Sequence, residues 1–356
     1  MSAPDEPDRP SVSFLCCAYR TEDTVVETIE SVRAQTRDDW QLVVVDNGPS
    51  DEMARIVEPY LADPRVVLIR QPNAFAAGGV NAAGRAAVGR YVAVLHTDDL
   101  VEPMFMERLV TTLDGLPDVH VLTPDARFLT KTGVRRPTFR EPVPAAYRQG
   151  APVTLREMVE GWIPYYTGLV RKEVWDAIGG FRHDTPAVED LSFFVDLLTA
   201  GYVHQVLEEP LALYRESENS DSRGARGVEV MEDSFERVVT AAVDEIGTAE
   251  DRAALAVAIP RSRHRRATVR ARRLLLEGDV PGAREAAEAA LAHRPDARTR
   301  GVVLALRWAP RLLLLLYRVK KALHRWRSRL STQAALHERD PGQLTDGTSR
   351  APDSPV

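Results

Sequence analysis

The chain of 356 residues is 44% hydrophobic and 28% charged, which is typical of a globular protein with one large domain and an appendage, or with two modest domains. The net charge of −6 hides a division: residues 1–260 carry 25 basic against 43 acidic side chains, and residues 261–330 carry 19 against 5. This division predicts an acidic body and a basic arm that contacts an anionic surface.

The two cysteines and the first residues indicate the compartment. Cys16 and Cys17 are adjacent on an expected strand and point to opposite faces, which excludes a disulfide framework and a cysteine zinc site. Residues 1–10 are acidic and proline-rich and have no apolar core, so we expect a disordered N-terminus and no signal peptide. These features predict a cytoplasmic protein with reduced cysteines.

The first hundred residues alternate between short apolar runs and segments with helical periodicity. Strands are expected at residues 11–18, 41–45, 65–70 and 91–95, and helices at 24–34, 52–61 and 76–88. Alternation at this pitch predicts right-handed crossovers and a doubly wound, mostly parallel sheet.

Polar side chains follow three of these strands at the point where each strand ends. Tyr19 follows the first strand, Asp46 the second, and the pair Asp98 and Asp99 the fourth. Ligands of open α/β sheets bind outside the carboxyl ends of the strands, where paired carboxylates suit a divalent cation and the phosphate that it carries. The alternative for Asp99 is to cap a helix that begins near residues 102–103.

The pattern is looser from residue 104 to residue 222. Strands are expected at residues 119–124, 126–129, 163–171, 203–208 and 212–215, and helices at 107–116, 172–177 and 191–200. Glu189 and Asp190 come at the first turn of the last of these helices, where acids often complement the helix dipole.

The segment after residue 222 is expected to be helical. Helices are expected at 229–246, 270–277 and 282–292, and the last two resemble one tetratricopeptide-type unit, although one copy is too few for a repeat array. Residues 302–330 form a basic helix whose arginines prevent it from spanning a bilayer. This helix either lies on an anionic membrane surface or packs on the body. Residues 331–356 are expected to be a disordered tail.

Seven ordered segments between residues 11 and 222 carry a resemblance to a known family. They read SVSFLCCAYR, TIESVRAQTRDDWQLVVVDNG, RQPNAFAAGGVNAA, GRYVAVLHTDDLVEP, GLVRKEVWDAIGGF, VEDLSFFVDLLTAGY and LALYRESENS. In these segments the chain resembles glycosyltransferase family 2. The resemblance implies the α/β GT-A fold for residues 11–222, and we expect residues 223–330 to form an α-helical C-terminal region.

The same resemblance implies an activity. The expected protein is a metal-dependent, inverting glycosyltransferase that moves a sugar from a nucleotide-diphosphate donor to a hydroxyl acceptor, with Mg²⁺ or Mn²⁺ as cofactor. The acceptor class stays open between a surface glycan, a lipid-linked intermediate and a small molecule. The basic helix at 302–330 favours a position at the inner face of the membrane.

Residues at the expected sheet edge match the donor site of the family. Tyr19 would stack near the nucleotide base, and Asp46 would accept a hydrogen bond from the base. Asn81 would support the diphosphate side of the pocket, and Asp98 would bind the ribose hydroxyls. Asp99 would ligate the cation that bridges the two phosphates.

Residues later in the chain match the reacting groups. Asp190, or as the less favoured choice Glu189, matches the general base that takes the proton of the acceptor hydroxyl. Arg215 follows Tyr214 in a closing motif that either positions the diphosphate or packs against the helix of the base.

Three aromatic residues precede the base, and we expect one of them to contact the acceptor. They are Trp162, Tyr165 and Tyr166. Aromatic faces suit a sugar ring, and they suit a hydrophobic core equally well.

Some positions depart from the family pattern. His96 stands where an acid is common, and we expect it to line the pocket rather than to ligate metal. With Phe75 and Val80, it motivates a second hypothesis, a catalytically impaired scaffold that binds nucleotide sugars. A nucleotidyltransferase is disfavoured because the loop at 18–23 has no glycine. We expect no nucleic-acid partner, because no recognisable module accompanies the arginines at 261–273.

Overall fold

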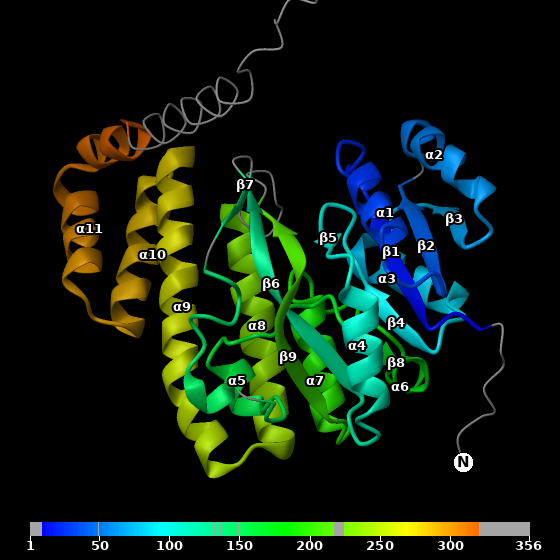
Figure 1. Ribbon diagram of the computed structural model, residues 1–356. Helices are drawn as coiled ribbons and strands as arrows, with labels where there is room; N and C mark the ends of the chain where they lie inside the picture. Colours follow the sequence, from blue (N-terminus) through cyan, green and yellow to red (C-terminus); the bar gives the residue numbers. More distant parts are fainter. Residues whose placement is uncertain are drawn as a thin grey trace, which may run out of the picture.

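The computed structural model describes residues 9–48, 50–130, 133–135, 137–148, 150–216 and 224–319. Within these residues a mixed sheet is flanked by helices, and a set of longer helices follows it at the C-terminal side (Figure 1). The tail expected at 331–356, the expected N-terminal segment up to residue 8 and residues 320–330 of the expected basic helix lie outside the described residues.

The described strands form one nine-stranded sheet. Its order is β3-β2-β1-β4-β8-β6-β9-β5, with β7 paired to β6. The strands are β1 (Val12–Ala18), β2 (Trp40–Asn47), β3 (Val66–Gln71), β4 (Tyr91–Val94), β5 (Leu100–Val101), β6 (Val121–Thr130), β7 (Gly133–Arg135), β8 (Leu169–Arg171) and β9 (His204–Arg215). β1 to β4 are mutually parallel, and antiparallel pairing begins where β4 meets β8. The carboxyl ends of β1, β2 and β4 therefore share one edge, as the alternating pattern predicts.

Helices cover both faces of this sheet. They are α1 (Val25–Arg33), α2 (Asp51–Val57), α3 (Phe75–Ala86), α4 (Phe105–Asp114), α5 (Leu155–Val159), α6 (Lys172–Ile178) and α7 (Glu189–Thr199), with short 3₁₀ turns at Glu58–Ala62 and Ala145–Tyr147. Successive side chains of β1 enter opposite layers: Phe14 packs in the core beneath α1 and α4, and Leu15 packs in the core beneath α3 and α7. Burial on both faces explains the nearly continuous apolar runs of the parallel strands.

The second half of the sheet, from β8 to β5, is mixed, since β6 and β9 are parallel to each other, and it differs from the sequence prediction. The two strands expected at 119–124 and 126–129 are one strand, β6, because an irregularity at Asp125 lets pairing with β9 continue. The strands expected at 203–208 and 212–215 are likewise one strand, β9. The strand expected at 163–171 is wrong except for β8. Pro164 cannot donate to a sheet, and the tyrosines beside it turn toward Asp99 instead.

The C-terminal region contains α8 (Ala225–Ile246), α9 (Ala249–Glu277), α10 (Val280–His293) and α11 (Ala297–Trp308), and residues 310–319 are also helical. The helix expected at 270–277 is only the end of α9. Thr248 begins α9 with a capping box to Asp251, and Gly278 ends it in a left-handed conformation. The sequence pattern missed residues 249–269 because they are rich in arginine and contain Pro260. α9 packs against α5, α8 and α10, and so joins the first part of the chain to the last helices (Figure 1).

Candidate active site

The end of β2 forms the first wall of the candidate site. Asp46 is 2% exposed, and its carboxylate accepts hydrogen bonds from the backbone N–H of Ser50 at 3.0 Å and from Nε of Arg70 at 3.0 Å. Gly48 has φ of +145°, and a Cβ atom there would lie 3.0 Å from the ring of Tyr19. The Tyr19 ring therefore lies against the turn after Asp46, and it is 40% exposed.

The turn after β4 gathers three side chains that are able to ligate a metal. One ligand atom of each of His96, Asp98 and Asp99 lies within 4.8 Å of the others. Hydroxyls from α1 and the segment before it hold the turn: Thr28 donates to the carbonyl oxygen of Asp99 at 2.8 Å, and Thr24 to that of Thr97 at 2.8 Å. The sequence prediction treated His96 as a pocket-lining residue, and a ring nitrogen of His96 lies close to the carboxylates of Asp98 and Asp99.

Asp99 is the most constrained side chain of the cluster. It is 1% exposed, and its carboxylate accepts hydrogen bonds from the Tyr165 hydroxyl at 3.0 Å, from the Tyr166 hydroxyl, and from the backbone N–H of Arg215 at 2.6 Å. Burial, with the nearby charge of Asp98, raises the pKa of Asp99 to about 6 against the opposing effect of these hydrogen bonds and of His96.

Arg215 fastens the last strand to the same turn. Its Nε donates to the carbonyl oxygen of Asp98 at 2.6 Å, and its terminal nitrogen pairs with Glu27 of α1 at 2.6 Å. In this arrangement the guanidinium group positions the turn of Asp98 and Asp99 rather than extending into open space. Glu27 had no signal in the sequence, because the partner residue is 188 positions away.

Glu189 and Asp190 lie at the start of α7. Asp190 accepts a hydrogen bond from the backbone N–H of Leu191 at 2.8 Å, so it does satisfy part of the first turn of the helix. Burial raises the pKa values of both acids, and the imidazole of His96 acts against this rise in each. The electrostatic effect of His96 therefore reaches both Asp99 and the two acids at the start of α7.

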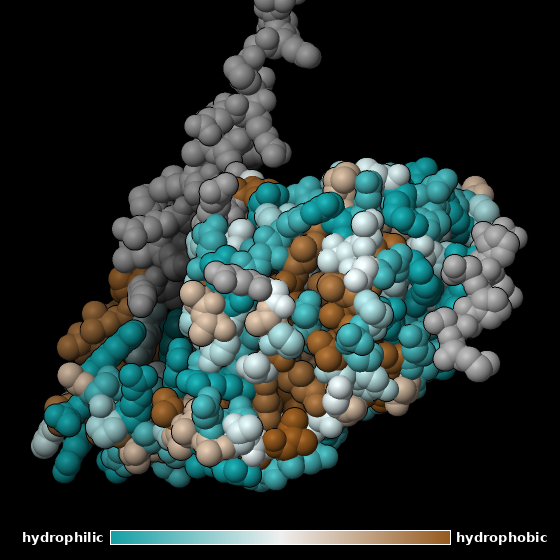
Figure 2. All heavy atoms as spheres, turned by 60° about the horizontal axis from the view of Figure 1, so that its bottom comes forward, coloured by the Kyte–Doolittle hydropathy of each residue, from teal (hydrophilic) through white to brown (hydrophobic). Residues whose placement is uncertain are grey.

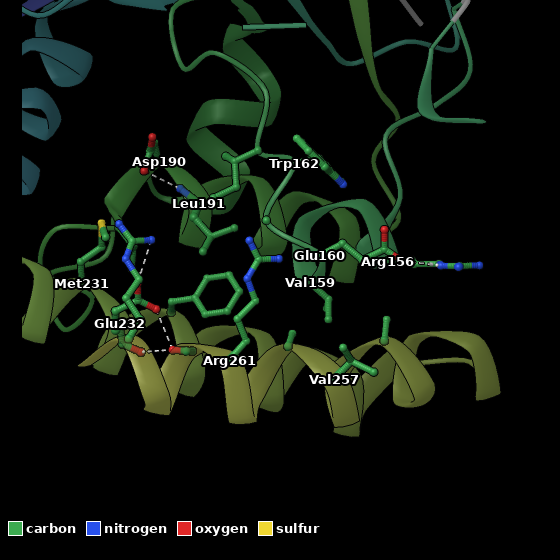
Figure 3. Close-up of a pocket in the computed structure, with 18 of the residues that line it drawn as sticks. Arg156, Val159, Glu160, Trp162, Asp190, Leu191, Met231, Glu232, Val257 and Arg261 are labelled. Atoms are coloured by element: carbon green, nitrogen blue, oxygen red, sulfur yellow. Dashed lines mark hydrogen bonds and ion pairs between the residues drawn. The ribbon is translucent and has the colours of Figure 1, made fainter. Parts of the chain in front are cut away.

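The remaining predicted residues lie at different places. The Asn81 amide donates to the Phe181 carbonyl oxygen and accepts from the Phe181 N–H, both at 2.8 Å, so it clamps the loop before α7. Tyr166 also stacks on His96, with ring centroids 4.1 Å apart. Of the three aromatic residues expected near the acceptor, Tyr165 and Tyr166 bind Asp99, and Trp162 lines a cavity of about 870 Å³ that Asp190 also lines (Figure 3). The walls of this cavity contributed by α8 and α9 had no counterpart in the sequence prediction.

Comparison with known proteins supports a family assignment. Residues 13–178 match the family model described as Glycosyl transferase family 2. The chain is 28% identical over 220 residues to Putative glycosyltransferase EpsE of Bacillus subtilis, and the aligned region covers 60% of this chain and 75% of that protein. It is 39% identical over 107 residues to Succinoglycan biosynthesis protein ExoO of Rhizobium meliloti, which covers 30% of each. Several curated relatives are matched over only 14% to 36% of their own length.

Solved structures of low sequence identity share the fold. S. aureus TarS has a TM-score of 0.56 at 17% identity, with 83% of this chain and 52% of that chain covered. The mannosyltransferase PcManGT from Pyrobaculum calidifontis, solved in complex with GDP-Man and Mn²⁺, has a TM-score of 0.53 at 18% identity, with 88% and 85% covered. These similarities establish the GT-A fold of the present chain.

The buried Asp99 carboxylate predicts a pH-dependent effect on stability. Its pKa is about 6 in the folded protein against 3.8 for the unperturbed group, so its protonation stabilises the folded state fully below about pH 4, and this contribution is lost as the pH rises through about 6. The variant Asp99→Asn lacks this titration. The free energy of unfolding is measured with a chemical denaturant in EDTA. The value for the variant minus that for wild type is expected to be larger at pH 8 than at pH 5, by roughly 1 kcal/mol. If the difference in the free energy of unfolding between variant and wild type were the same at both pH values, the raised pKa of Asp99 in the folded protein would be contradicted.

Proposed function

Since residues 13–178 of this chain match the model of glycosyltransferase family 2 and the chain has the GT-A fold, we propose that the protein transfers a sugar from a nucleotide-diphosphate donor to an acceptor hydroxyl, with inversion at the anomeric carbon. The observation that carries the proposal is the cluster of His96, Asp98 and Asp99 beyond β4, with Asp46 at the end of β2 on the same edge of the sheet.

The donor is assigned to the strand ends. The exposed Tyr19 ring offers a stacking face for the base, and the Asp46 carboxylate is positioned by Ser50 and Arg70 to accept a hydrogen bond from it. Asp98 is assigned to the ribose hydroxyls. Asn81 supports this pocket indirectly through its clamp on Phe181.

The residues of the cluster fit a divalent cation. Carboxylate oxygens are the preferred ligands of Mg²⁺ and Mn²⁺, and the charged form of Asp99 is unfavourable in the buried site unless a cation offsets it. Asp99 would hold the ion, with Asp98 and His96 beside it. A bound cation supplies Lewis-acid stabilisation to the charge that develops on the departing nucleoside diphosphate.

Asp190 is assigned as the general base. Its carboxylate accepts the proton of the acceptor hydroxyl while the hydroxyl oxygen bonds to the anomeric carbon, and the bond to the diphosphate breaks with its electron pair on the nucleotide. A single displacement of this kind inverts the anomeric carbon. The raised pKa of Asp190 suits a base, because a carboxylate of higher pKa binds the proton more strongly.

Transfer and donor binding are expected to separate in the variant Asp190→Asn. A thermal-shift screen of nucleoside diphosphates with Mn²⁺ should find one base that stabilises wild type and variant equally. Transfer from the matching nucleotide sugar should fall by about 10²- to 10⁴-fold in the variant, because proton transfer loses its acceptor. The matched control is Glu189→Gln, in which the loss should be smaller.

Two outcomes would contradict the proposal. A protein that no nucleotide stabilises has no donor site of this kind. The second outcome is a wild-type protein that binds nucleotide but transfers no sugar, so that Asp190→Asn has no transfer activity to reduce. This outcome would favour the catalytically impaired scaffold.

We also propose that the last helices lie on an anionic membrane surface. Leu306 and its neighbours pack on α9 and α10, but the opposite face leaves Trp308 76% exposed, with Leu312, Leu315 and Leu316 each more than half exposed. Apolar side chains gather at the left of Figure 2 over these helices. The exposed Arg307, Arg311 and Arg318 accompany them, a combination that suits anionic headgroups. No helix of the described residues is long and apolar enough to cross a membrane.

Membrane binding is expected to depend on the exposed face alone. The triple variant Trp308→Gln, Leu315→Gln, Leu316→Gln keeps the packed face, and its binding to phosphatidylglycerol-containing vesicles should fall by at least about tenfold. Co-sedimentation measures this, and Val88→Gln, a change at another exposed apolar residue, is the control. Undiminished sedimentation of the triple variant would show that the helices serve the fold only.

A further inference from the structure

A cavity of about 870 Å³ lies between α5, the start of α7, α8 and α9 (Figure 3). Its wall is mainly apolar, and includes Val159, Trp162, Ile163, Leu191, Phe235 and Val257. Along α9 the lining continues with Ala253, Ala254 and Ala258, which offer no hydrogen-bonding side chains. Asp190, the assigned base, belongs to the same wall, so an occupant of the cavity would meet the reacting centre.

Most charged side chains of the wall are already paired. Arg265 binds Glu232 at 3.0 Å, and Ser262 donates to the same carboxylate at 2.7 Å. At the rim, Arg156 binds Glu160 at 2.9 Å and the largely exposed Glu250 at 3.1 Å. These contacts account for the charged groups of the lining other than Asp190 and Arg261.

Arg261 differs from the other arginines near it on α9. Arg263 and Arg266 form ion pairs with Glu236 and Asp233 of α8. Within the described residues, Arg261 has no such partner. Figure 3 shows its side chain rising from α9 into the cavity, with Asp190 beyond it on one side and Val257 on the other. An unpaired guanidinium group above an apolar wall favours an anionic group on an apolar ligand.

We propose that this cavity is the acceptor subsite, and that the acceptor is an amphiphile in which a phosphate links a sugar to an apolar chain. The inference rests on the proposed function. The sugar hydroxyl lies at Asp190 and gives its proton to that carboxylate when its oxygen bonds to the donor's anomeric carbon. The phosphate pairs with Arg261, and the chain follows the alanines of α9 and leaves past Val257, which is 72% exposed.

The amphiphile fits better than a free glycan does. A glycan presents hydroxyls along its whole length, and burying them against alanine and valine without hydrogen bonds is unfavourable. A single chain buried on the same wall gains free energy from the removal of apolar surface from water. The exposed apolar face of the last helices would hold the protein where such an acceptor resides.

Binding of a simple amphiphile tests the subsite. The probes are decyl phosphate below its micelle concentration, the neutral decyl glucoside and inorganic phosphate, titrated calorimetrically into the full chain. Decyl phosphate should bind most tightly of the three, and Arg261→Gln should weaken it by about tenfold or more, through the loss of a charge-assisted contact. Arg252→Gln, an exposed arginine of α9 outside the cavity, should leave it unchanged.

A second variant tests the apolar wall. Val257→Glu places a carboxylate at an exposed position that tolerates charge, and it should also weaken decyl phosphate by about tenfold or more. The inference would be overturned if decyl glucoside or inorganic phosphate bound as tightly as decyl phosphate. It would also be overturned if Arg261→Gln bound decyl phosphate as tightly as wild type.

A nucleotide titration separates this inference from the proposed function. Nucleoside diphosphate with Mn²⁺ should stabilise Arg261→Gln and wild type alike. Stabilisation by nucleotide without binding of decyl phosphate would refute the subsite and leave the proposed function standing. Binding of decyl phosphate without any effect of nucleotide would refute the proposed function on which the acceptor assignment rests.

Discussion

The carboxylate of Asp99 is removed from water and receives its hydrogen bonds from distant parts of the chain. Tyr165 and Tyr166 reach it from the segment before β8, and the backbone of Arg215 reaches it from the end of β9. A buried charge without such partners would cost several kcal/mol. The hydrogen bonds to this one group therefore join the parallel half of the sheet to its mixed half at the edge where the candidate site lies.

At the same carboxylate, the stability of the fold and the proposed binding of a cation favour opposite protonation states. Burial raises the pKa of Asp99 to about 6, so its charged form makes the folded state less stable near neutral pH. That charged form is the one that would hold the proposed cation. The hydrogen bonds from the tyrosines and from Arg215 keep the side chain in a single position before any ligand arrives, which lowers the cost of ordering the site.

In the C-terminal helices, many of the arginines at residues 261–319 form ion pairs between helices. The sequence predicts that the basic residues at 261–330 contact an anionic surface, but Arg263, Arg266 and Arg273 pair with acids of α8. Much of the positive charge thus holds two helices together, and the acidic excess of the first 260 residues includes their partners. Arg261, on the cavity side of α9, stays available to a ligand, and Arg307, Arg311 and Arg318 accompany the exposed apolar face.

The sequence by itself determined the parallel half of the sheet and the acids that follow its strands, because both depend on local patterns of apolar and polar residues. It also placed Glu189 and Asp190 at the start of a helix. Only the tertiary structure decided that His96 joins the cluster of Asp98 and Asp99, that the expected strand at 163–171 breaks to deliver two tyrosine hydroxyls, and that α9 walls a cavity beside Asp190. The tyrosine contacts and the cavity wall join residues more than sixty positions apart, for which a single sequence carries no periodic signal. His96 is close to Asp98 and Asp99 in the sequence, but the turn that brings the three together is held by the distant Thr24 and Thr28.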